Sequence, residues 1–172
     1  IPNDSKSRAG GVLYSDYSLG RFFAEAARQP WFENTIFLVT ADHCASSAGR
    51  TEIPLQKYHI PALILAPGLI EPGVVDGIVS QIDLMPTLLS LLNMSYDSHF
   101  YGRSIFDPAY VNRAFIATYQ DLGYLEGDTF TILSPVRRFE QYRVVPTEEN
   151  PHHLEAMERK DAVQVDLSLI HI

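Results

Sequence analysis

The adjacent residues Asp42 and His43 carry the two side chains in this sequence best suited to hold a metal ion together. They follow residues 35–40, a continuous β-branched and aromatic run that predicts a strand buried on both faces. In open α/β sheets, ligands bind beyond the carboxyl ends of such strands. A carboxylate and an imidazole at that point suit Zn²⁺ or Mn²⁺. The alternative is that Asp42 caps the following loop and His43 makes a nearby hydrogen bond.

Both side chains can reach one ion only if the strand ends at this dipeptide, because consecutive residues of a strand point to opposite faces. The small, polar residues 44–49 that follow indicate a loop and so favour such an ending. Cys44 is either a soft additional ligand or redox-sensitive thiol, or a small residue packed in that loop; we favour the packed residue. His59 precedes a second apolar run and is either close to a substrate or a hydrogen-bonded structural histidine.

Other charged residues have structural explanations as well as functional ones. Asp83 lies at the start of an apolar helical pattern, where we expect a helix cap rather than a catalytic carboxylate. Arg103 follows a glycine, and we expect a surface arginine rather than a contact to an anionic substrate. Asp16, in the first helix, is either a distant acid or a residue that makes a structural hydrogen bond or a surface pair, and we favour the second interpretation. The only basic cluster consists of Arg137, Arg138 and Arg143, which we assign to a solvated strand face rather than to lipid head groups.

Length and composition limit the class of protein. The chain has 172 residues, 46% of them hydrophobic, which is sufficient for one globular domain. The net charge of −8 argues against a nucleic-acid partner, because phosphates require a basic face. A single cysteine excludes an internal disulfide. The most apolar stretches, residues 60–70 and 84–94, contain proline and fall short of the roughly 20 residues that a membrane-spanning helix needs.

The hydrophobic pattern predicts alternating helices and strands that lead into a group of strands. Ser7 is the expected N-cap of the first helix, and Asp83 the expected cap of the second. The predicted helices are residues 9–28, 80–94 and a closing helix at 154–166, and the predicted strands are residues 35–40, 61–66, 112–119, 129–133 and 137–145. The fold class is therefore α/β, with an antiparallel hairpin region after residue 94.

Five segments, in order, resemble one known family. They are YSDYSLGRFF (14–23), NTIFLVTADH (34–43), YHIPALI (58–64), SQIDLMPTLL (80–89) and GRSIF (102–106). Together they resemble sulfatases and lipoteichoic-acid-synthase-like phosphoglycerol transferases of the alkaline-phosphatase-like superfamily. The resemblance implies the C-terminal part of that fold, a mainly parallel sheet with flanking helices and a small antiparallel hairpin region. It implies a catalytic-core half at residues 1–106 and an antiparallel appendage with a C-terminal helix at residues 107–172.

The resemblance also implies a site. Asp42 and His43 match the metal pair of the family, with manganese usual in the transferases and calcium in true sulfatases. The nucleophile, a Thr or a formylglycine, and the remaining ligand precede the stretch that Ile1 begins, so we expect no catalytic nucleophile in this chain and no turnover by it alone. The implied substrate is a phosphatidylglycerol-type lipid or another phosphate or sulfate ester.

Among these activities we favour a phosphoglycerol transferase, because the segments ADHCASS and YHIP resemble that branch more closely. A true sulfatase and a non-catalytic structural or interaction module are the alternatives. The resemblance implies an extracytoplasmic location, periplasmic or at the cell surface, for a domain of a cytoplasmic (inner) membrane protein. Because the chain begins with isoleucine, we expect a processed product or a piece of a larger domain whose N-terminal half is its partner. An exposed sheet edge would then favour self-association.

Overall fold

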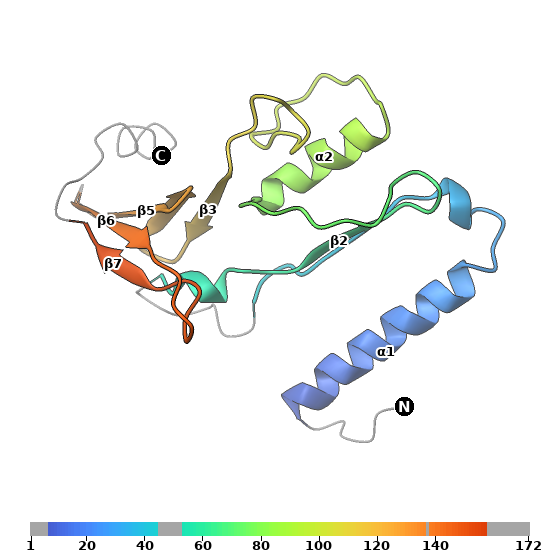
Figure 1. Ribbon diagram of the computed structural model, residues 1–172, viewed down its shortest axis with the longest axis horizontal. Helices are drawn as coiled ribbons and strands as arrows, with labels where there is room; N and C mark the ends of the chain where they lie inside the picture. Colours follow the sequence, from blue (N-terminus) through green and yellow to red (C-terminus); the bar gives the residue numbers. More distant parts are fainter. Residues whose placement is uncertain (1–6, 45–52, 137, 158–172) are drawn as a thin grey trace. The chain divides into compact units, whose positions relative to one another are not determined.

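The computed structural model describes residues 7–44, 53–136 and 138–157 (Figure 1). The chain divides into two compact units, one made of residues 1–39 and 62–73 and the other of residues 40–61 and 74–172. Within the described ranges, no helix combines the length and apolar character needed to cross a membrane. The division predicted between residues 106 and 107 separates a catalytic core from an appendage and stays a prediction.

The first unit contains the long helix α1 (Arg8–Ala26), the short 3-10 turn η1 (Phe32–Asn34) and most of a two-stranded sheet of β1 (Phe37–Thr40) and β2 (Ala62–Leu65). The Ser7 hydroxyl accepts a hydrogen bond from the Gly10 N–H at 3.0 Å, which confirms the predicted N-cap. Aromatic rings pack where α1 meets β1, with centroids 5.3–6.2 Å from the ring of Phe37; they belong to Phe22, Phe23, Trp31 and Phe32.

The second unit is built on a five-stranded antiparallel sheet. Its strands, in spatial and chain order, are β3 (Arg113–Ala117), β4 (Leu122–Glu126), β5 (Thr129–Ser134), β6 (Arg138–Val144) and β7 (Leu154–Ala156). The three strands predicted in this region correspond to β3, β5 and β6. The pattern missed β4, because Gly123 interrupts its apolar residues. That glycine leaves room for the ring of Phe130, which a Cβ would approach to 2.8 Å.

The core of this unit lies under the sheet. Its buried members are Ile53, Leu55, Ile116, Leu125 and Phe130. The turn η2 (Leu55–Lys57) supplies one of them, so the segment after residue 52 is anchored to the sheet by burial of apolar surface.

The helix α2 (Leu84–Leu91) follows the 3-10 turn η3 (Gln81–Asp83) in the same unit. Asp83 accepts a hydrogen bond from the Ser80 N–H at 3.2 Å, so its carboxylate caps the start of η3, one turn earlier than predicted. Pro86 is buried in the first turn of α2, where the missing N–H costs no intrahelical hydrogen bond.

The larger sheet of the described residues is antiparallel and begins at residue 113, in the region after residue 94 where an antiparallel hairpin region was predicted. Short connections join β3 through β6, and only antiparallel neighbours permit them. The mainly parallel sheet was expected for the part before residue 94 and stays a prediction. One prediction in the second unit needs correction. The closing helix predicted at 154–166 begins instead as β7, which pairs with β6 through Val144 and Leu154. Residues 158–166 of that prediction lie outside the described residues.

Candidate metal centre

Asp42 and His43 follow β1 after one intervening residue, Ala41, and two segments distant in sequence hold this stretch of backbone. The Thr40 hydroxyl donates to the carbonyl of Pro61 at 3.1 Å, and the Ala41 N–H donates to the same oxygen at 3.4 Å. From η3, the Gln81 amide donates to the carbonyl of Ala41 at 3.0 Å. The strand ends at Thr40, the predicted last residue, so Asp42 and His43 lie outside it, and hydrogen bonds to segments distant in sequence hold the backbone there.

The two side chains are oriented by bonds within the loop. Asp42 Oδ1 accepts the backbone N–H of His43 at 2.9 Å. His43 Nδ1 lies 2.9 Å from the carbonyl oxygen of Cys44. Because a carbonyl only accepts hydrogen bonds, Nδ1 carries the proton and Nε2 of the neutral ring keeps its lone pair. That Nε2 lies 3.4 Å from Asp42 Oδ2, with the two side chains 70% and 87% exposed for His43 and Asp42.

This arrangement fits two ligands of one metal ion. Nε2 of His43 and Oδ2 of Asp42 lie close enough together to contact one cation. Two ligands about 2.1 Å from a tetrahedral ion are about 3.4 Å apart, which matches the separation of these atoms. Within the described ranges, no group of three or more His, Cys, Asp or Glu side chains forms a metal site. Asp42 and His43 as metal ligands therefore stay a prediction, and the described residues offer no third ligand of these types beside them.

Cys44 and His59 lie beside this pair with structural contacts. The Cys44 thiol donates to the carbonyl of His59 at 3.1 Å, which is the packed role favoured for this cysteine. The His59 ring lies 5.4 Å from the ring of His152, on the connection between β6 and β7. Burial, and secondly the charge of His59, lowers the pKa of His152 below its usual value. The Nδ1 atom of His152 is buried and has no hydrogen-bond partner among the described residues.

A second group of polar residues was not predicted from the sequence. The Asp83 carboxylate is completely buried and pairs with both Nη atoms of Arg113 at 2.9 and 3.2 Å. It also accepts the Tyr110 hydroxyl at 3.0 Å and the Arg103 N–H at 2.8 Å. We call Asp83, Tyr110 and Arg113 the Asp83 cluster. The nearest sequence signal was the acidic residue at the start of an apolar helix, which indicated a cap and gave no partners.

The electrostatics of the Asp83 cluster follow from burial. Desolvation, and then the hydrogen bond to Asp83, raises the pKa of Tyr110 to about 12. Burial lowers the pKa of Arg113, but the hydrogen bond and charge of Asp83 outweigh it and raise that pKa above its usual value. The cluster therefore keeps a neutral phenol and a paired guanidinium around a buried carboxylate, an arrangement that fixes position rather than performs chemistry.

The remaining predicted charges lie on the surface. Asp16 is exposed on α1, and Arg103 and Arg138 are exposed in the second unit. Arg143 pairs with Asp128 at 3.5 Å, also exposed. Arg137 lies outside the described residues. The exposed positions of Arg103, Arg138 and Arg143 agree with the surface positions predicted for these arginines.

Comparisons with known proteins identify the family of this chain. Residues 3–94 match the family model of the sulfatases. An arylsulfatase of Clostridium perfringens (strain 13 / Type A) is 30% identical over 107 residues, which cover 57% of this chain and 22% of that protein. A crystal structure of a protein in the alkaline phosphatase superfamily from Vibrio parahaemolyticus matches with a TM-score of 0.85 and 32% identity, covering 96% of this chain and 40% of that one. The chain spans less than half the length of either relative. The family match over residues 3–94 shows that it belongs to the sulfatase family, and the structural match shows an alkaline-phosphatase-like fold.

Proposed function

We propose that this chain contributes Asp42 and His43 as metal ligands to the active site of a phosphoglycerol transferase that acts on a phosphatidylglycerol-type lipid, with Mn²⁺ as the ion. The observation that carries the proposal is the 3.4 Å separation of His43 Nε2 and Asp42 Oδ2 at the end of β1 in a sulfatase-family chain. Sulfatases and their alkaline phosphatase relatives generally use divalent metals. The segments around the metal pair and at residues 58–61 favour the transferase branch.

In this proposal, the residues of this chain bind the metal ion and orient its ligands. Asp42 and His43 would hold the ion, which when bound polarises an ester oxygen and lowers the pKa of an attacking hydroxyl. The Cys44 carbonyl keeps the proton of His43 on Nδ1, so that Nε2 stays available as a ligand. The Gln81 amide holds the backbone of the metal pair from η3. In this proposal the chain supplies two ligands of the coordination shell, on a backbone that hydrogen bonds from other segments hold.

The nucleophile, in this proposal, is a Thr in an N-terminal half of the catalytic domain that precedes this stretch. The chain matches only 22% and 40% of the lengths of its relatives, so the proposal assigns it to part of a larger domain. A second-half chain by itself would bind metal weakly and would lack turnover. We place the whole domain outside the cytoplasmic membrane, and propose that exposed sheet edges allow self-association when this half is isolated.

A true sulfatase is the second candidate, and the arylsulfatase relative favours it. In that case Ca²⁺ would be the ion and a formylglycine the nucleophile. A non-catalytic structural module is the third, because the described residues provide only the two ligands of one dipeptide.

Metal binding by the chain tests the shared part of these proposals. Mn²⁺ is titrated into the chain and water-proton relaxation is followed, with Asp42→Asn and His43→Gln as variants and the exposed His99→Gln as the matched control. We expect weak saturable binding that both site variants lose and the control keeps. Equal binding by all four proteins would refute the assignment of Asp42 and His43.

Turnover separates the candidates. The full-length protein is assayed with a fluorescent phosphatidylglycerol analogue and with an aryl sulfate, and the isolated chain with both. Transfer from the lipid with little aryl sulfate hydrolysis supports the transferase, and the reverse result supports the sulfatase. Loss of the dominant activity in Asp42→Asn is expected in either case, and substantial turnover by the isolated chain would contradict a nucleophile outside it.

A further inference from the structure

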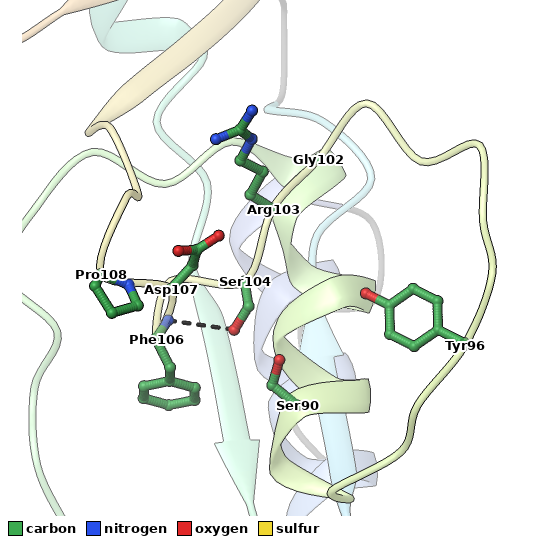
Figure 2. Close-up of a pocket in the computed structure, with 8 residues that line it drawn as sticks. All are labelled: Ser90, Tyr96, Gly102, Arg103, Ser104, Phe106, Asp107 and Pro108. Atoms are coloured by element: carbon green, nitrogen blue, oxygen red, sulfur yellow. Dashed lines mark hydrogen bonds between the residues drawn. The ribbon is translucent and has the colours of Figure 1, made fainter.

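A cavity of about 500 Å³ opens in the second unit beside the last turn of α2. It is lined by Ser90, Tyr96, Gly102, Arg103, Ser104, Phe106, Asp107 and Pro108, and we call it the 90–108 pocket. In Figure 2 the Ser90 and Ser104 side chains lie between the rings of Tyr96 and Phe106. We propose that this pocket binds a neutral, hydroxyl-rich ligand, specifically a single sugar unit.

The backbone that forms the pocket is held by buried groups of η3 and α2. The Ile105 N–H donates to the buried Thr87 hydroxyl at 3.1 Å, and the Arg103 N–H donates to the buried Asp83 carboxylate at 2.8 Å. A Cβ at Gly102 would collide with the carbonyl oxygen of Ile82, so only glycine permits this close approach. The lining is thus positioned before a ligand arrives, which reduces the entropy lost on binding.

The side chains, in contrast, have hydrogen-bonding capacity to spare. Among the residues that the structure describes, neither the Ser90 hydroxyl, the Tyr96 phenol nor the Arg103 guanidinium has a hydrogen-bond partner. Asp107 Oδ1 accepts the Ala109 N–H at 2.8 Å, and the second oxygen of this carboxylate remains available. The pocket therefore presents a guanidinium, a carboxylate and hydroxyls on a rigid frame.

The balance of these groups selects the class of ligand. One positive charge on Arg103 and one negative charge on Asp107 leave the pocket without a preference for an anion or a cation. Hydroxyl groups of a ligand both donate and accept, so they satisfy the carboxylate and the guanidinium at once. The rings of Tyr96 and Phe106, both exposed, offer apolar faces to the C–H groups of a sugar ring. The inference does not depend on the metal centre or its reaction.

An NMR titration tests the pocket directly. The full chain, labelled with ¹⁵N, is titrated with methyl glucoside, methyl galactoside, methyl mannoside and sodium sulfate in separate experiments. We expect at least one glycoside to shift the amide signals of residues 102–107 in a saturable way at millimolar concentration. Sulfate is expected to leave these signals in place.

Variants with matched controls decide whether the pocket is responsible. Arg103→Gln and Phe106→Ala are each expected to weaken glycoside binding by about tenfold or more, as loss of a charged hydrogen bond or an aromatic contact implies. The exposed Arg28→Gln and Tyr119→Ala serve as controls and should bind as the unmodified chain does. The same spectra report whether each variant is folded. Absence of saturable glycoside shifts, tighter binding of sulfate than of any glycoside, or unchanged affinity in folded Arg103→Gln would overturn the proposal.

Discussion

Replacing Arg113 by methionine is the sharpest test of what holds the second unit together. The Arg113 side chain is 12% exposed, and its guanidinium makes its two shortest contacts with a carboxylate that has no exposed surface. Methionine keeps much of the apolar stem of arginine and removes the charge. The substitution therefore leaves the volume nearly filled, but the buried charge of Asp83 no longer has a charged partner.

The magnitude follows from what remains around Asp83. Removing one partner of a buried ion pair typically costs about 3–5 kcal/mol in the free energy of unfolding. Two hydrogen bonds from Arg113 are lost, whereas those from the Ser80 N–H, the Arg103 N–H and the Tyr110 hydroxyl stay. These remaining donors stabilise the carboxylate, so we expect the lower end, about 3 kcal/mol.

Urea unfolding followed by circular dichroism measures this loss. Arg143→Met is the matched control, because its exposed pair with Asp128 at 3.5 Å should contribute about 1 kcal/mol or less. The double variant Asp83→Asn with Arg113→Met should be less destabilised than the sum of the two single variants, since no buried charge is then left unpaired. A loss for Arg113→Met no greater than for Arg143→Met would refute the structural role given to the Asp83 cluster.

Three further predictions concern other parts of the chain. Gly102→Ala should destabilise the chain in urea unfolding, because the added Cβ meets the backbone of η3. The control Gly20→Ala on α1 has open space around it and should be neutral or stabilising by about 0.5–1 kcal/mol. Equal effects of the two substitutions would contradict the close packing at Gly102. Tyr110 has a folded-state pKa of about 12, above the unfolded value of about 10, so its contribution to stability is complete below pH 10 and is lost as the pH rises toward 12. In a spectrophotometric titration, Tyr110→Phe should lack one phenolate that the unmodified chain forms near pH 12. Loss of a phenolate that forms near pH 10 would contradict the raised pKa of Tyr110. Because the pKa of His152 is lowered in the folded state, its contribution to stability is present above the usual pKa of about 6.5 and is lost as the pH falls. His59→Asn should raise the pKa of His152 in an NMR titration. An unchanged pKa would exclude a charge effect of His59.

The local elements were predictable because their signals are local. The stripe of α1 and its Ser7 cap lie within a few residues of each other, the apolar and β-branched residues of β1 and β5 follow one another, and those of β6 alternate with polar ones. The edge strand β7 was not predictable, because it depends on pairing with β6 across the intervening connection. An isolated strand of that length has no stability of its own, so its sequence gives little indication of it.

The candidate site also has a part that the sequence predicted and a part that it did not. The types and adjacency of Asp42 and His43, and the end of the strand before them, followed from the residues themselves. The Gln81 amide that holds this turn comes from 40 positions away, and no pattern in the sequence joins the two. The nucleophile and the metal that the resemblance implies stay predictions.

The sequence by itself determined which groups are available: a carboxylate beside an imidazole, a capping serine, and an acidic residue at the start of an apolar helix. The tertiary structure decided their partners. Asp83 was expected as a cap, and the fold also made it the buried partner of Arg113, 30 positions later. A cap is set by backbone groups within one turn, whereas a buried ion pair forms only where the fold removes both charges from water together.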